Sequence, residues 1–357
     1  MQNERNNTVT YVKAVGITLM VLGHIIPYPS MWWNAIYAFH MPLFFLMSGY
    51  CFKEKYLDDA KQFVLRKIKG IYVPFVAFSL VYLTLHNVFS SWYFYESDWL
   101  YGWKDFAWNA GRIVTRMSHN EGLLGTFWFL KELFWGSLIF YAAMRVAKGR
   151  VVPVLLGLFA LAEAMCVFGL QIPYFTISYN SVYAAFFIAC GYLWKVKSER
   201  ISELGIRGKW LLCIIGIAAL IIELIWSPQI GMLGNTPLSL VYYAIPAIGT
   251  TMMVFYGCRW MESRLPNAIS KVIQFVGNHS LFIMALHFTA FKLVSLVLIK
   301  AHHMPIERLV EFPVVRDCAN GGGAMLLYTF VGVCVPLVCA WLWQVVRCKV
   351  EGVRCKV

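Results

Sequence analysis

The sequence predicts an all-α, polytopic membrane protein with about ten transmembrane helices and with both termini on the cytoplasmic side. Of its 357 residues, 60% are hydrophobic and only 14% are charged, whereas soluble domains average about 25% charged residues. Ten apolar runs are long enough, or nearly so, to cross a bilayer, which takes about 20 residues. The period-two alternation of a membrane β-barrel is missing. Helices, which satisfy their own backbone hydrogen bonds in lipid, therefore suit these runs.

The ten runs follow one another with no soluble domain and no Gly/Ser linker, so residues 1–357 are predicted to form one domain. The polar start MQNERNNTVT has no cleavage site, which predicts that the first helix is retained. A short turn from Pro27 to Met31 makes the first two helices an antiparallel hairpin. Longer loops cover residues 86–121 and 301–323. The predicted helices are 11–28, 32–52, 71–90, 122–146, 151–170, 179–196, 210–227, 238–258, 280–300 and 324–346.

The distribution of positive charge predicts the orientation of these helices. If the N-terminus is cytoplasmic, the outer loops hold few cations, namely Lys104, Arg112, Arg116, Lys300, Arg308 and Arg316. The inner loops and tails hold the remaining clusters, including the runs from Lys53 to Lys69 and from Arg347 to Lys356. This asymmetry follows the positive-inside rule. It accounts for the net charge of +13, so we expect a lipid bilayer as the partner and no nucleic acid.

Two ionisable residues lie in the first predicted helix, with ten residues between them: Lys13 and His24. At about 100° per residue, both side chains fall on nearly the same helix face, roughly 16 Å apart along the axis. An ionisable group inside a membrane helix is costly and by default marks a functional site. This pair is therefore the leading candidate for function.

A second histidine, His40, lies in the next helix of the hairpin. Counted from the turn, His24 and His40 lie within about 6 Å of each other in depth. A buried histidine is often only a satisfied core residue, but two at matched depth favour catalysis. Histidine is well suited to general-base chemistry near neutral pH. The sequence therefore predicts His24 and His40 as catalytic residues.

The remaining candidates are polar residues of later helices. In the helix 122–146, Trp128, Lys131 and Glu132 are predicted to lie in the outer half, where Glu132 would orient a histidine or a sugar hydroxyl. The alternative for Lys131 or Glu132 is a structural ion pair with another helix. His287 is predicted nearer the inner half of the helix 280–300. The ten cysteines fall mostly in apolar runs without a C-x-x-C pair, so we expect no metal or disulfide framework.

Two loops are unusually rich in one kind of side chain, more than is needed to connect two helices. The basic loop after the second helix contains Arg66, Lys67 and Lys69. Its cations either set the orientation of the helices or bind an anionic, phosphate-bearing donor. The outer loop 86–121 is rich in aromatic residues. Its aromatics either anchor the protein at the membrane interface or stack on sugar rings.

Five segments together resemble the integral-membrane acyltransferase family three, and most closely its fucose 4-O-acetylase-like branch. They are Lys13-x10-His24, FHMPLFFLMSGY (39–50), RKIKGIYVPF (66–75), TFWFLKELF (126–134) and NHSLFIMALHF (278–288). The resemblance implies acylation of extracytoplasmic sugars of polysaccharides or glycolipids by a cytoplasmic acyl-CoA. It also implies that His24 is essential for transfer and that Arg66 fills the position of a family arginine.

The residues and the resemblance together predict which residues bind the donor, which bind the acceptor and which carry out the transfer. Acetyl-CoA is expected to bind through Lys13, Arg66, Lys67 and Lys69, and its pantetheine arm to run toward His24. Trp128, Lys131 and His287 are expected to bind the acceptor. His24 would act as a general base or form an acyl-histidine intermediate, and the sequence leaves both open. The expected location is the inner membrane of a bacterium, as a monomer or a homo-oligomer. The alternative function is a transporter or flippase without acyl chemistry.

Overall fold

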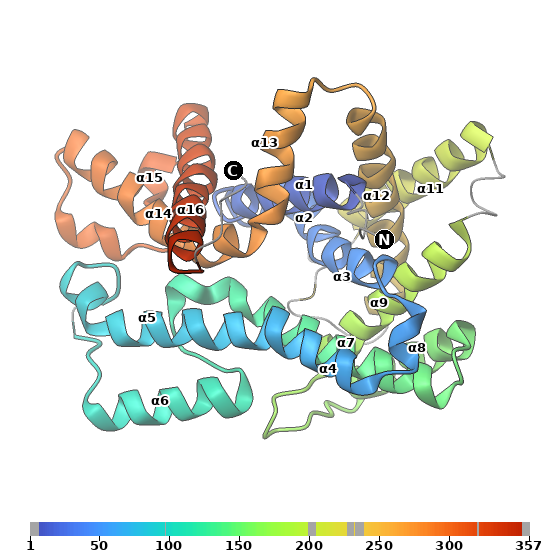
Figure 1. Ribbon diagram of the computed structural model, residues 1–357. Helices are drawn as coiled ribbons and strands as arrows, with labels where there is room; N and C mark the ends of the chain where they lie inside the picture. The colour runs from blue at the N-terminus through green and yellow to red at the C-terminus, as the bar shows by residue number, and fades with distance from the viewer. Residues whose placement is uncertain are drawn as a thin grey trace.

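The computed structural model describes residues 7–96, 98–198, 205–226, 232, 239–319 and 321–351, and these ranges are almost entirely helical (Figure 1). The only extended pairing within them is an isolated bridge between Ile172 and Ile177. The predicted all-α class is thereby confirmed. The helices form one assembly in which α1, α3, α7 and α9 lie near the centre (Figure 1).

Every apolar run of the sequence falls on a helix. Eight runs form one principal helix each, although several boundaries move by a few residues. These helices are α1 (Asn7–Gly23), α7 (Trp128–Val146), α8 (Val151–Val167), α9 (Tyr179–Val196), α11 (Gly205–Trp226), α12 (Ser239–Glu262), α14 (Ser280–Ala301) and α16 (Gly322–Glu351). The run 71–90 is part of a longer helix, and the run 32–52 is divided.

The division separates α2 (Met31–Tyr37) from α3 (His40–Tyr50). At Phe39 the backbone leaves the helical region, with φ −139° and ψ −21°. Pro42 explains the position of this break. It has no N–H to donate to the carbonyl of Ala38, four residues earlier, so the helix cannot continue through that turn. The single predicted helix 32–52 is therefore wrong, and His40 becomes the first residue of α3.

Several segments predicted as loops are helical. The basic loop contains η1 (Glu54–Leu57) and α4 (Ala60–Lys67), which continues through the π-helical segment Ile68–Tyr72 into α5 (Val73–Ser91). The aromatic loop contains α6 (Trp103–Arg116), which runs back along α5 (Figure 1). The other additions are α13 (Asn267–Asn278), η4 (Ile306–Val310) and α15 (Arg316–Ala319). The start of the predicted helix 122–146 is the separate 3₁₀ segment η3 (Gly122–Phe127).

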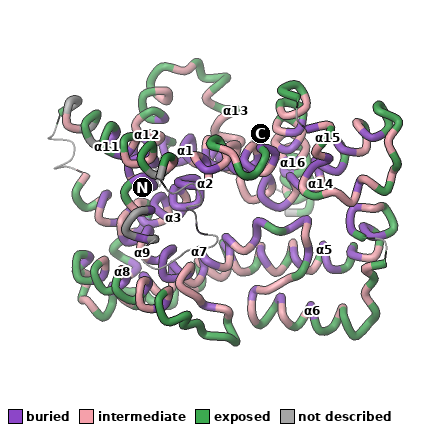
Figure 2. The backbone as a smooth tube through the Cα atoms, turned by 180° about the vertical axis from the view of Figure 1, so that it is seen from behind, coloured by how far each residue is buried: buried purple, intermediate pink, exposed green. Residues whose placement is uncertain are grey.

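The best-packed part of the molecule is the crossing of α3 and α9. A Cβ atom on Gly49 would overlap the backbone carbonyl of Ile188, and one on Gly191 would overlap that of Leu46. Only glycine lets two helix backbones approach so closely. Figure 2 shows buried backbone along α1–α3 and α9, whereas α6 and α8 are largely exposed.

Among the described residues, four helices are long and apolar enough to cross a membrane: Ala60–Ser91, Gly122–Val146, Ser280–Ala301 and Gly322–Val350. Large apolar side chains are exposed on several helices, such as Leu156 on α8, Ile225 on α11 and Leu326 on α16. A large exposed apolar surface of this kind marks contact with lipid or with another protein. The chain is thus a multi-pass membrane protein. The number of ten spans and the cytoplasmic termini stay predictions.

Candidate active site

His24 directly follows the last residue of α1, and its N–H donates to the carbonyl of Met20. Its Nδ1 is 3.2 Å from the hydroxyl of Tyr37 on α2. Its ring stacks on that of His287, with centroids 5.4 Å apart, and meets the ring of Phe288 edge-on at 4.8 Å. Three separate helices therefore fix the position of this imidazole.

His40 lies on the other side of Tyr37, whose ring is 4.7 Å from the His40 ring. The His40 side chain is buried, and its Nδ1 is 2.8 Å from the carbonyl oxygen of Ile36. Because a carbonyl only accepts, Nδ1 carries the proton, so the neutral ring has its lone pair on Nε2. His24, Tyr37 and His40 line one small cavity of about 50 Å³. We call it the histidine cavity.

His287 does not lie below this level, as the sequence predicted, but beside His24. The reason is α13, which packs along the N-terminal half of α1, where Tyr11 donates to Ser270. Consequently α14 begins part of the way along α1. The Nδ1 of His287 donates to the carbonyls of Ile283 and Met284, at 3.0 Å each. Its buried Nε2 has no hydrogen-bond partner among the residues that the structure describes.

The loop after α14 also packs against these rings. The ammonium of Lys292 donates to the carbonyls of Leu309, Val310 and Glu311. Phe312 packs against Phe288 with centroids 4.6 Å apart. This buried lysine therefore anchors the loop, and the loop supports the phenylalanine that holds His24.

A larger cavity of about 460 Å³ lies at the other end of α1, and we call it the lysine cavity. Lys13, Ser48 and Arg66 line it. Lys67 lies 3.5 Å from Ser48. Beyond it is an open basic groove of about 800 Å³, whose cations are Lys55, Lys61, Arg66 and Lys69. The predicted donor residues are thus brought together.

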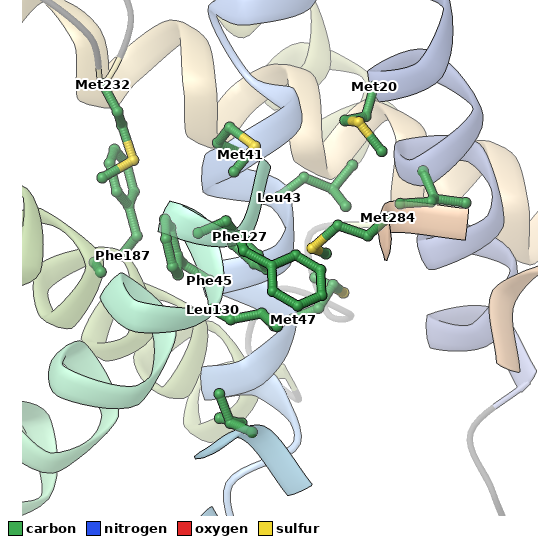
Figure 3. Packing of buried hydrophobic residues seen from close by; sticks show 14 of the residues in the cluster. Met20, Met41, Leu43, Phe45, Met47, Phe127, Leu130, Phe187, Met232 and Met284 are labelled. Carbon is green, nitrogen blue, oxygen red and sulfur yellow. The ribbon is translucent and has the colours of Figure 1, made fainter. Parts of the chain in front are cut away.

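The three spaces are neighbours. Arg66 and Gly70 line both the basic groove and the lysine cavity. Phe44, Phe129 and Met284 line both the lysine cavity and the histidine cavity. Figure 3 shows Met20, Met41 and Met284 extending from three different helices around this region. A row of spaces therefore leads from the basic groove past Lys13 to His24.

Gly70 offers a test of this row, because no heavy atom lies within 4 Å of a Cβ built on it. We expect Gly70→Phe to fold, to obstruct the passage between the groove and the lysine cavity, and to weaken binding of acetyl-CoA about tenfold or more. Gly70→Ala is the control and should bind like the wild type. Equilibrium dialysis with radiolabelled acetyl-CoA measures both. Equal affinity of the Phe variant and the wild type would contradict the route.

Glu132 does not lie at the histidines. Its carboxylate is 3.1 Å from the ammonium of Lys131 and accepts a hydrogen bond from Ser181 of α9. Lys131 also lies 3.3 Å from the hydroxyl of Thr176. The ion pair thus joins two neighbouring residues of α7 and not two different helices, and Glu132 does not orient a histidine. The reason is that the Glu132 side chain projects from the side of α7 that faces α9 rather than α1.

Trp128 borders two spaces. It lines the histidine cavity and also a further cavity of about 380 Å³, which Lys131 lines as well. The aromatics of the segment 86–121 have a different role. Tyr95, Trp99 and Tyr101 surround the buried ring of His86, with Tyr101 stacked on it at 3.6 Å. Trp103 and Trp108 of α6 are exposed.

Sequence reasoning missed Tyr37 and the buried pair of His86 and Glu121, whose atoms Nδ1 and Oε2 are 3.1 Å apart. The available signal was that Tyr37 lies only three residues before His40, across the break between α2 and α3. For the pair of His86 and Glu121 the sequence contains no such signal, because the pairing depends on where α6 turns back. Within the described ranges, no group of three or more His, Cys, Asp or Glu residues is placed to hold a metal ion.

The fold and the site define an integral-membrane protein with ionisable side chains buried between its helices. A sequence profile described as an acyltransferase domain matches residues 6–343. The chain therefore belongs to acyltransferase family three, the family that its motifs resemble.

A relative is the nodulation protein NolL of Mesorhizobium japonicum. It is 24% identical to this chain over 155 residues, which cover 40% of this chain and 36% of NolL. The chain thus matches about a third of the length of that relative. No solved structure matches the chain.

Proposed function

We propose that this protein transfers an acetyl group from cytoplasmic acetyl-CoA to a hydroxyl of an extracytoplasmic sugar in a polysaccharide or glycolipid. The observation that carries the proposal is the row of spaces from the basic groove through the lysine cavity to the histidine cavity. A donor with phosphates at one end and a long thin arm suits that shape. A bacterial inner membrane is the proposed location, and the bacterial origin of NolL supports it.

The basic groove would bind the phosphates of acetyl-CoA. Lys55, Lys61 and Lys69 provide positive charge around it, and Arg66 provides a planar guanidinium suited to phosphate. Arg66 is held in place by the hydroxyl of Tyr56, to which it donates at 2.6 Å. The pantetheine arm would pass Lys13 in the lysine cavity, whose walls are otherwise mostly apolar. The thioester would then reach the histidine cavity.

At the histidine cavity, His24 would take the proton of the acceptor hydroxyl. When Nδ1–H of His24 donates to the oxygen of Tyr37, the lone pair is on Nε2. The hydroxyl oxygen then attacks the thioester carbonyl, so a C–O bond forms and the C–S bond breaks. The proton on His24 passes to the leaving CoA thiolate. Acyl transfer by a positioned base of this kind typically gains about 10² to 10⁴ in rate.

Transfer of radiolabelled acetyl groups by purified, reconstituted protein tests the proposal, with methyl glycosides and cell-envelope polysaccharide as acceptors. We expect label on the acceptor with the wild type. With Lys13→Ala we expect an acetyl-CoA KM raised about tenfold or more, because a hydrogen bond to a charged group contributes about 1.5–3 kcal/mol. The exposed residue Lys300 provides the control Lys300→Ala, which should match the wild type. No binding and no turnover of acetyl-CoA by the wild type would contradict the proposal.

A further inference from the structure

The cavity of about 380 Å³ beside Trp128, which we call the tryptophan cavity, is not part of the route proposed for the donor. It lies between the segment 117–122, the start of α5 and the start of α7. Its polar lining includes His119, Asn120, Glu121, Lys131 and Thr176. Its volume is within the range of cavities that bind small molecules, about 300–1,000 Å³. Trp128 lines both this cavity and the histidine cavity.

The wall formed by the segment 117–121 is held in place by α6. Arg112 donates to Ser118 at 2.9 Å and to Asn120 at 3.2 Å. Asn120 in turn donates to Asn109, a buried residue of α6. Through this network the amphipathic helix α6 fixes the position of the segment 117–121, which borders the cavity.

Glu121 is fixed from the opposite side. It pairs with His86 of α5, and both side chains are almost completely buried, at 0% and 1% exposed. His86 is itself held by its Nε2, which donates to the carbonyl of Trp99 at 3.1 Å. The cavity wall is thus built before any ligand binds, and preorganisation of this kind lowers the cost of binding.

The polar groups offer both donors and acceptors. Burial lowers the pKa of His119 to about 4, so at neutral pH its ring carries one N–H and one lone pair. The Nδ1 of His119 is buried and has no hydrogen-bond partner within the described structure. Glu121 adds a carboxyl group and Lys131 an ammonium. A phosphate would meet Glu121 unfavourably, and a lipid chain would leave these groups unsatisfied. Hydroxyl groups, which donate and accept, suit them all.

We infer that the tryptophan cavity is the acceptor subsite and that it binds one sugar ring, with Trp128 against the ring and His119 and Glu121 on its hydroxyls. The inference rests on the proposed function, because a hydroxyl presented at Trp128 lies next to the histidine cavity. His119 and Glu121 are then binding residues of the acceptor. Phe44, Phe129 and Met284, which line both the lysine cavity and the histidine cavity, do not line the tryptophan cavity, so the sugar and the donor would reach the histidine cavity past different residues.

Saturation-transfer NMR with the purified full chain tests this inference without any acyl chemistry. The probes are the methyl glycosides of glucose, galactose and fucose. We expect the wild type to bind at least one of them and His119→Asn to bind it about tenfold more weakly, because buried polar partners are lost. His302→Asn changes an exposed histidine and should bind like the wild type. The affinity for acetyl-CoA should be unchanged in both variants.

A second pair of variants covers the case in which His119→Asn fails to fold. A Cβ on Gly122, which lines the cavity, meets only Tyr95, at 3.7 Å. Gly122→Leu should therefore fill the cavity and weaken glycoside binding, whereas Gly122→Ala should not. Absence of glycoside binding by the wild type, or full affinity in Gly122→Leu, would overturn the inference. If the wild type binds a glycoside but does not bind acetyl-CoA, only the proposed function is overturned.

Discussion

Replacing His24 with asparagine is expected to reduce acetyl transfer by about a thousandfold, while acetyl-CoA still binds. The asparagine amide can still hydrogen-bond Tyr37 and roughly occupies the same space, but it cannot accept a proton from the acceptor. A positioned general base typically contributes about 10² to 10⁴ in rate. Its neighbours His40 and His287 donate through Nδ1 to backbone carbonyls, so they do not take over the Tyr37 contact.

The measurement is kcat for transfer of radiolabelled acetyl, together with the dissociation constant of acetyl-CoA. His302→Asn is a matched control, because the same change is made on an exposed ring. We expect the control to have wild-type kcat and both proteins to elute as folded species. A His24→Asn variant that keeps full activity would remove His24 from the mechanism.

Substituting alanine for Gly191 is expected to prevent normal assembly of the bundle. The new Cβ would overlap the carbonyl of Leu46, and the corresponding atom in Gly49→Ala would overlap that of Ile188. Backbone atoms cannot rotate away, so α3 and α9 would have to separate. Overpacking of side chains typically costs about 1–3 kcal/mol, and we expect each of these variants to exceed that. Movement of α3 would also displace His40.

Gly157→Ala on α8 is the matched control, because no heavy atom lies within 4 Å of a Cβ at that position. Alanine also has a higher helix propensity than glycine. We expect the control to be extracted from membranes as a monodisperse species with an unchanged melting temperature. We expect Gly49→Ala and Gly191→Ala to give little or no monodisperse protein on extraction. Wild-type yield and melting temperature in both would show that the crossing is not close.

Much of the fold could be predicted because a bilayer imposes a simple rule on sequence. Apolar runs must be helices, and every predicted run falls on one. Glycines allow two helices to pack closely, and Gly49 and Gly191 lie where α3 and α9 cross. The break at Phe39 was missed because it depends on a hydrogen bond that Pro42 fails to make. Likewise, hydropathy does not detect α6 or α13, since both are amphipathic helices outside the apolar runs.

The donor side of the site was predictable and the acceptor side largely was not. Lys13 and His24 share one helix, so their spacing follows from helix geometry alone, and Arg66 was prominent as part of a basic cluster. By contrast, His287 meets His24 only because α13 shifts the start of α14. His119 and Glu121 reach Trp128 only because α6 turns back along α5. Contacts that depend on the packing of distant segments cannot be read from local periodicity.

Acetyl transfer across a sealed bilayer is the most direct test of the account. Proteoliposomes are prepared with radiolabelled acetyl-CoA trapped inside and methyl glycoside added outside, and the acetylated glycoside is measured. A second preparation has both compounds inside only. The account predicts product in the first preparation, none with His24→Asn, and none in the second. Product that forms only when donor and acceptor share one side would contradict transfer along the route from the basic groove to His24.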